Sequence, residues 1–152
     1  MPPQGLPPDD HIPQFGQAVP GVNYVDRPSA YAVIFRRDRR VAVVSTPRGV
    51  FLPGGGQEAG EAPDETAVRE SMEECGLPIR PSRELGAADQ LVFTPGHATG
   101  LRKRCTFFAA EVDTVACGRR EADHVLLWLT PGEAAQQLSY ASHRWAVAKA
   151  AA

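Results

Sequence analysis

The sequence predicts an α/β domain with a mixed β-sheet and helices on both faces of that sheet. Strand-like segments both precede and follow an acidic helical segment at residues 63–75, and two further helical segments lie near the end of the chain. Strands and helices in this order suggest such a layered arrangement. The 152 residues suffice for one domain with a substantial core, and they contain neither an internal repeat nor a second domain boundary.

The first twenty residues differ in composition from the rest. Residues 1–20 hold six of the fourteen prolines and few large apolar side chains, which predicts an extended or mobile N-terminal arm. An alternative is that this arm folds over a functional site or a partner subunit, as in a homodimer. We expect the folded domain to span residues 21–152, with its core beginning near Val22.

The first strands precede the acidic helix. Apolar segments at 29–35 and 41–45 flank the charged run 36–40, which predicts a hairpin with a solvated turn. The four arginines of this turn are an alternative phosphate site. A short strand at 51–53 should then lead into a glycine loop at 54–56.

The acidic segment has the start and stop signals of a helix from Pro63 to Cys75. Proline suits the first helical position, and Asp64 and Glu65 lie in the first turn, where the helix dipole favours negative charge. Gly76 is placed to be the left-handed residue that ends the helix.

The two sides of this helix differ in chemistry. Glu70, Glu73 and Glu74 share one arc, which we expect to point away from the main packing surface. The opposite, mostly apolar side should face the core, and it comprises Ala67, Val68, Ser71, Met72 and Cys75. The nearest partner for a buried Ser71 hydroxyl is the carbonyl of Ala67.

The three glutamates crowd the C-terminal half of the helix, where the dipole disfavours anions. Like-charge neighbours cost about 0.2–0.5 kcal/mol per pair, so stability alone does not explain the cluster. Mg²⁺ commonly uses one or two carboxylates together with substrate phosphates, and Mn²⁺ is an equivalent choice here. The preceding glycines allow bare backbone to approach a cation or a phosphate. The competing interpretation is a solvated acidic helix face.

Beyond the helix, Pro78 and Pro81 mark a connector, and residues 94–100 form a loop. The remaining predicted elements are strands at 85–93, 106–112 and 125–129 and helices at about 130–138 and 142–150. Thr130 and Glu133 have the spacing of a capping box at the start of the first of these helices.

Bulk properties exclude several classes of protein. The net charge of −2 and the isoelectric point near 6.1 give no global attraction to nucleic acid or to an anionic membrane. No apolar run approaches the ~20 residues of a membrane span, and no secretory signal is visible. The odd number of cysteines, without metal-type spacing, suits the reducing cytoplasm: Cys75, Cys105 and Cys117.

The segment from Gly55 to Leu77 resembles a Nudix box. The pattern is glycine, five residues, glutamate, seven residues, arginine-glutamate, an aliphatic, any residue, two glutamates, any residue, glycine and an aliphatic. The matching positions are Gly55, Glu61, Arg69, Glu70, Glu73, Glu74, Gly76 and Leu77. The single departure is Ser71, which stands where an aliphatic residue is usual.

This resemblance implies an α/β/α sandwich with a loop-helix-loop catalytic motif. It also implies hydrolysis of a nucleoside diphosphate linked to another group, with Glu70, Glu73 and Glu74 as metal ligands. By the same resemblance Gly55 contributes a backbone carbonyl, Arg69 orients the glutamates, and Glu61 braces the loop. The neighbouring glycines support the site: Gly54, Gly56 and Gly76.

Family members vary in the glutamate that activates water, so the general base is either a box glutamate or a later acid. Glu121 is the first later candidate, followed by Asp123 and Asp89, and each is otherwise a plain surface acid. Arg102 and Arg104, with Lys103 between them, are candidates for binding a substrate phosphate, or are ordinary edge charges.

The resemblance leaves the substrate open. The tyrosine that often follows the box in dinucleoside polyphosphate hydrolases is missing, although Phe93 falls near its place, and Pro95 lies late for the ADP-ribose subgroup. A nucleoside triphosphate is the default small-molecule substrate. The rival function is a nucleotide-sensing module without catalysis, but such proteins usually lack some box glutamates. RNA cap removal finds no support in the net charge.

Overall fold

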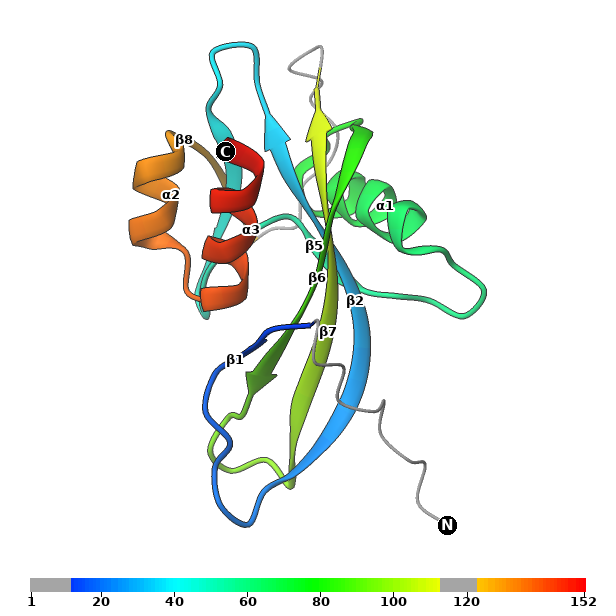
Figure 1. Ribbon diagram of the computed structural model, residues 1–152, viewed down its shortest axis with the longest axis vertical. Helices are drawn as coiled ribbons and strands as arrows, with labels where there is room; N and C mark the ends of the chain where they lie inside the picture. The colour runs from blue at the N-terminus through cyan, green and yellow to red at the C-terminus, as the bar shows by residue number, and fades with distance from the viewer. Residues whose placement is uncertain (1–11, 113–122) are drawn as a thin grey trace.

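The structure, a computed structural model, describes residues 12–112 and 123–152. Helix α1 lies on one side of the sheet, and α2 and α3 lie on the other (Figure 1). The elements in chain order are β1 (Gln14–Phe15), β2 (Asn23–Phe35), β3 (Val41–Thr46), β4 (Gly49–Phe51), β5 (Gly54–Gly56), α1 (Pro63–Cys75), β6 (Arg80–Val92), β7 (Thr99–Glu111), β8 (Val125–Leu129), α2 (Pro131–Gln137) and α3 (Ala141–Ala151).

Strand β2 organises the sheet. It pairs in parallel with β7 along its whole length, from Asn23 opposite Thr99 to Phe35 opposite Glu111. Its other edge pairs antiparallel with β5 and, at one position, with β3. In the described residues the strand order is β1-β6-β7-β2-β3-β4, with β8 paired to β3. The predicted mixed sheet is confirmed.

The predicted hairpin is present, but it is short. Its charged turn closes with a hydrogen bond from the Arg36 N–H to the Arg40 carbonyl, and β2 and β3 pair only at Phe35 and Val41. Beyond that point β3 pairs with β8 instead. The Asp38 carboxylate accepts hydrogen bonds from the Arg36 side chain and the Arg40 N–H, which fixes the shape of this surface turn.

Strands β6 and β7 are longer than predicted. Pro81 lies within β6, next to an irregularity in the pairing, and the basic run 102–104 lies inside β7 instead of leading into it. The first half of β7 extends with the first half of β2 beyond the helices, in the lower half of Figure 1. Prediction from apolar composition underestimates the length of such strands, because many of their side chains are polar and do not face the hydrophobic core.

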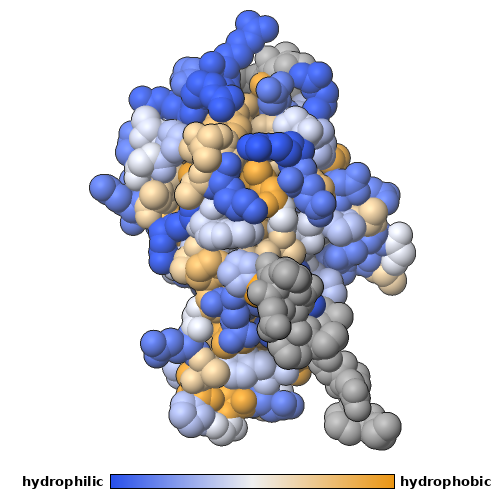
Figure 2. All heavy atoms as spheres, viewed as in Figure 1, coloured by the Kyte–Doolittle hydropathy of each residue, from blue (hydrophilic) through white to orange (hydrophobic). Residues whose placement is uncertain are grey.

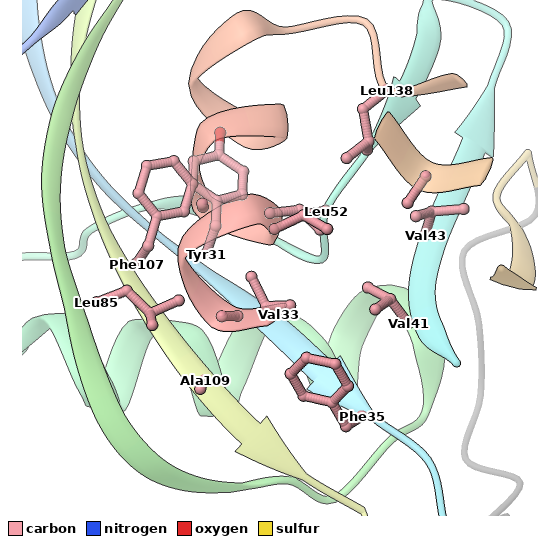
Figure 3. Close-up of a cluster of buried hydrophobic side chains, with 14 of the residues drawn as sticks. Tyr31, Val33, Phe35, Val41, Val43, Leu52, Leu85, Phe107, Ala109 and Leu138 are labelled. Carbon is pink, nitrogen blue, oxygen red and sulfur yellow. The ribbon is translucent and has the colours of Figure 1, made fainter. Parts of the chain in front are cut away.

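Alternation along β2 divides the core into two layers. Tyr31, Val33 and Phe35 point to the face covered by α3, where they join Phe107 and Leu85 (Figure 3). The intervening side chains point to the α1 face: Ala30, Ala32 and Ile34. Period-two alternation with burial on both faces is what a central strand between two helical layers requires.

Helix α1 begins and ends as predicted, with Pro63 at its first position and Gly76 in the left-handed conformation at φ 66°. The predicted core side is wrong for two residues, because Val68 and Met72 are 37% and 43% exposed. The buried residues are Thr66, Ala67, Ser71 and Cys75. These small side chains bring the helix close to the sheet and leave the larger apolar ones at its outer side.

The C-terminal helices also follow the prediction. The Thr130 hydroxyl oxygen accepts a hydrogen bond from the Glu133 N–H at 3.1 Å, so Thr130 caps α2. The reciprocal half of the capping box differs, because the Glu133 carboxylate accepts from the Thr130 hydroxyl rather than from its backbone N–H.

Part of the predicted arm belongs to the sheet. Gln14 and Phe15 pair with Asp89 and Gln90, and the Phe15 ring lies 6.3 Å from that of Trp145 on α3. On the face that Figure 2 shows, hydrophilic residues interrupt the apolar areas. No helix in residues 12–112 and 123–152 combines the length and apolarity that crossing a membrane requires.

Candidate active site

The three glycines before the acidic helix form strand β5, not the loop that we expected, and the loop follows at residues 57–62. Gly54 pairs with Tyr31 and Gly56 with Ser29. A Cβ atom on Gly55 would lie 2.8 Å from the carboxyl carbon of Glu70, closer than such contacts occur. Glycine at position 55 therefore lets the backbone of β5 and the Glu70 carboxylate lie against each other.

Two of the three facing glutamates turn toward this strand. The Gly54 N–H donates a hydrogen bond to Glu74 Oε1 at 2.9 Å, and the other carboxylate oxygen of Glu74 lies 3.4 Å from His124 Nδ1. The side chains of Glu70 and Glu74 are 18% and 14% exposed, against 53% for Glu73. The expectation that all three point away from the packing surface therefore holds only for Glu73.

Arg69 connects the helix to the loop before it. Its guanidinium donates to both carboxylate oxygens of Glu61, at 2.7 and 3.0 Å, and to the Gly56 carbonyl at 3.1 Å. One nitrogen also donates to Glu70 and Glu73, at 3.0 and 3.1 Å. Such charge-assisted bonds fix the orientation of the carboxylates that accept them.

Glu61 is held from several directions. Besides Arg69, the Thr66 hydroxyl and the Glu58 N–H donate to its carboxylate. The hydrogen bond from Arg69 is the main reason that the pKa of Glu61 falls to about 2. The same pairing raises the pKa of Arg69. Glu61 thus stays ionised at neutral pH and joins the loop to the helix.

A pocket of about 610 Å³ opens beside β5. Gly54, Gly55 and Glu74 line one part of it. Phe51 and Tyr140, with ring centroids 4.8 Å apart, line another. The lining also includes four basic side chains: Arg48, His97, Lys103 and His124. The pocket thus combines an acidic patch, aromatic surface and basic groups, which suits a ligand with an organic part and a phosphate chain.

The structure does not bring the predicted basic pair to this pocket. Arg102 forms an ion pair with Asp26 at 2.5 Å, and Arg104 pairs with Asp89 through two bonds of 2.8 and 2.9 Å. Successive side chains of a strand point to opposite faces, so Lys103 lines the pocket in their place.

Asp89 and Asp123, the two later candidates for the general base that the structure describes, do not line the pocket either. Asp89 is 4% exposed and bound to Arg104, while Asp123 is an exposed turn residue that does not line the pocket. Glu121 lies outside the described residues. Of the box glutamates, Glu70 and Glu74 lie beside β5.

Sequence reasoning missed His124, Phe51 and Tyr140 as pocket residues. His124 is the last residue of a charged run that directly precedes a strand. This position in the sequence could have predicted a residue near the edge of the sheet. The aromatic pair carries no such signal, because Phe51 and Tyr140 lie on different elements and meet only through the fold.

The residues beside β5 suit a magnesium ion. No group of three or more His, Cys, Asp or Glu side chains within residues 12–112 and 123–152 is arranged to hold a metal by itself. Glu70 and Glu74 nevertheless offer hard oxygen donors beside the bare backbone of Gly54 and Gly55. Mg²⁺ is commonly held by one or two carboxylates and completed by substrate phosphates, so this donor set fits it.

Comparison with known proteins identifies the family. The model of the NUDIX domain matches residues 25–150. No curated protein matches the chain. Three solved structures share the fold: a NUDIX hydrolase from Nitrosomonas europaea, an Ap4A hydrolase from C. elegans and a dihydroneopterin triphosphate pyrophosphohydrolase from E. coli.

The likeness to these structures covers most of each chain. The N. europaea protein has a TM-score of 0.66 at 20% identity, over 82% of this chain and 88% of that one. The C. elegans protein has a TM-score of 0.65 at 17% identity, over 81% of this chain and 93% of that one. The E. coli protein has a TM-score of 0.60 at 21% identity, over 82% of this chain and 94% of that one. The match to the domain model together with the intact box shows that this chain belongs to the Nudix family and is a hydrolase acting on pyrophosphate bonds.

Proposed function

We propose that the chain is a Mg²⁺-dependent hydrolase of a nucleotide, cleaving a phosphoanhydride bond in a nucleoside diphosphate linked to another group. The observation that carries this proposal is the contact between β5 and the helix. Glu70 and Glu74 lie against the bare backbone of Gly54 and Gly55. Glu74 and the two glycines line one part of a pocket large enough for a nucleotide.

The chain's own residues have separable tasks in this reaction. Glu70, Glu73 and Glu74 supply oxygen ligands, and Arg69 and Glu61 hold two of these carboxylates in place. A divalent cation held by these carboxylates would neutralise charge on the phosphate oxygens and would make a water more acidic. A box carboxylate would accept the proton of the water that attacks one phosphorus, and the anhydride bond of that phosphorus would break with release of the displaced phosphate. Glu121 is retained as a later candidate for that task.

A nucleoside triphosphate is the proposed default substrate. The pocket holds aromatic surface at Phe51 and Tyr140 for an organic group and basic side chains for phosphates. Two structures with this fold are described as hydrolases of Ap4A and of dihydroneopterin triphosphate, and both names denote phosphoanhydride compounds. Dinucleoside polyphosphate hydrolases often have a tyrosine at the place of Phe93, and here the residues on either side of it, Val92 and Thr94, line the pocket.

The test is a turnover assay on a panel of nucleoside triphosphates, dinucleoside polyphosphates and nucleoside diphosphate sugars. Phosphate and pyrophosphate are measured with Mg²⁺ or Mn²⁺ present, and again after chelation. We expect cleavage that requires the cation. Binding without turnover across the panel would favour the sensing module, and turnover that survives thorough chelation would contradict the metal assignment.

We further propose that the folded domain spans residues 21–152, that the protein is cytoplasmic, and that it is either a monomer or a homodimer. The family match supports a domain at residues 21–152. The free, buried thiol of Cys105 is compatible with a reducing cytoplasm. Light scattering on the purified protein distinguishes a monomer from a homodimer.

A further inference from the structure

Lys103 differs from the two arginines beside it. Arg102 and Arg104 are each paired with a carboxylate on a neighbouring strand. In the described part of the chain, no hydrogen bond or ion pair reaches the Lys103 ammonium group. The ammonium group lies over the Tyr140 ring, whose centroid is 5.7 Å from Nζ.

The ammonium group lies in the pocket wall and is not freely solvated. Burial lowers the pKa of Lys103, as expected for a cation that lacks a compensating partner. An unpaired charge at such a place costs stability unless an anion from outside the protein neutralises it. Glu74 lines the same pocket but forms no ion pair with Lys103 among the described residues.

We propose that Lys103 binds a phosphate of the substrate's polyphosphate chain and holds that chain beside Glu70 and Glu74. The assignment rests on the proposed function and specifies the substrate further, since it requires an anionic group within reach of the ammonium. Arg48, another basic residue of the pocket, forms no ion pair in the described residues and adds to the positive charge of the lining.

The alternative is a purely structural role, in which Lys103 only stacks on an aromatic ring and binds no ligand. The chain contains a matched control for this, because it has only two lysines. Lys149 also lies over a ring, with Nζ 4.6 Å from the centroid of Trp145, but on the exposed side of α3 and outside the pocket. A stacking role predicts the same behaviour for both lysines.

The first experiment uses the wild-type protein, so it does not depend on a variant folding. Both lysines are acetylated with limiting reagent, with and without sodium tripolyphosphate in the presence of Mg²⁺, and each is quantified by mass spectrometry. We expect tripolyphosphate to slow labelling of Lys103 by about tenfold or more and to leave Lys149 unchanged. Equal labelling of Lys103 with and without saturating tripolyphosphate would overturn the proposal.

The second experiment measures the dissociation constant of tripolyphosphate by calorimetry. Lys103→Met should weaken binding about tenfold or more, Lys103→Arg should retain most of it, and Lys149→Met should have no effect. Unchanged affinity in a folded Lys103→Met protein contradicts the assignment. Cleavage of nucleotides without protection of Lys103 would refute this inference alone, whereas protection without any cleavage would refute only the proposed function.

Discussion

Nδ1 of His143 accepts a hydrogen bond from the backbone N–H of Leu52 at 3.1 Å, although 91 positions separate the two residues in the sequence. His143 lies on α3, and Leu52 lies two residues before β5. The imidazole is fully buried, packed 4.5 Å from the Tyr31 ring, and its Nε2 atom has no hydrogen-bond partner in the described residues. Helix α3 therefore holds the segment that delivers the glycines to the site.

This contact predicts a pH dependence of stability. Burial lowers the pKa of His143 from 6.5 to about 3, so below pH 6.5 the unfolded chain takes up a proton that the folded one does not. The free energy of unfolding contributed by this group is complete above pH 6.5 and is lost between pH 6.5 and 3, by about 1.4 kcal/mol per pH unit. Urea denaturation at pH 7.5, 6 and 5 measures it. An identical slope in His143→Gln would contradict the assignment.

Glu61 predicts a second, more acidic transition. Its pKa falls from 4.5 to about 2, so the stability that its ionised form contributes is present above pH 4.5 and is lost as the pH falls toward 2. Glu61→Gln should flatten that acid limb and also lower kcat, because Arg69 loses its main carboxylate partner. Asp38→Asn is the matched control.

Asp38 also has a pKa of about 2, mainly through its hydrogen bond from Arg36, but it lies in the surface turn. Asp38→Asn should therefore leave kcat unchanged. Equal activities of Glu61→Gln and wild type, in melts and assays run side by side, would show that the Arg69 network does not position the site.

Glu74→Gln tests the metal ligands. The substitution keeps an oxygen that accepts from the Gly54 N–H but removes the charge that a cation needs. We expect kcat to fall by about 10²-fold or more, with the melting temperature preserved. Glu84→Gln, an exposed position on β6, should keep full activity. Normal turnover in Glu74→Gln would remove Glu74 from the ligand set.

Gly55→Ala tests the contact between β5 and Glu70. The added methyl group would lie 2.8 Å from the Glu70 carboxyl carbon, so we expect that side chain to be displaced and kcat to drop by about tenfold or more. Gly132→Ala, on α2 with open space around it, should raise stability slightly. Steady-state kinetics on both variants measure kcat, and a thermal melt of each measures its stability. Wild-type kcat in Gly55→Ala would show that the close approach is dispensable.

Ser71 is fully buried, and its hydroxyl has no hydrogen-bond partner in the described residues, so the bond that we expected to the Ala67 carbonyl is not formed. An unpaired buried hydroxyl costs about 1–3 kcal/mol, so Ser71→Ala should leave the melting temperature unchanged or raise it. Ser71→Leu should lower it, because overpacking costs about 1–3 kcal/mol. Both variants should turn over substrate, and complete loss of turnover in a folded Ser71→Ala protein would assign this serine to the chemistry.

The features of this protein that depend on local spacing follow from its amino-acid sequence alone. The limits of α1 follow from Pro63 and Gly76, the cap of α2 follows from Thr130, and the identity of the family follows from the box. Each of these signals lies within a few residues of its effect, where backbone geometry leaves few alternatives. The alternation of β2 likewise follows from the period of a strand.

The contacts between side chains that are distant in the sequence follow instead from tertiary packing. Val68 and Met72 turned outward because small residues bring α1 close to the sheet, and a helical projection does not fix how a helix is rotated against its neighbour. Lys103 instead of Arg102 or Arg104 reached the pocket because Asp26 and Asp89, on the strands paired with β7, hold the arginines. Such choices depend on strand register and on partners far away in the sequence, and no local pattern encodes them.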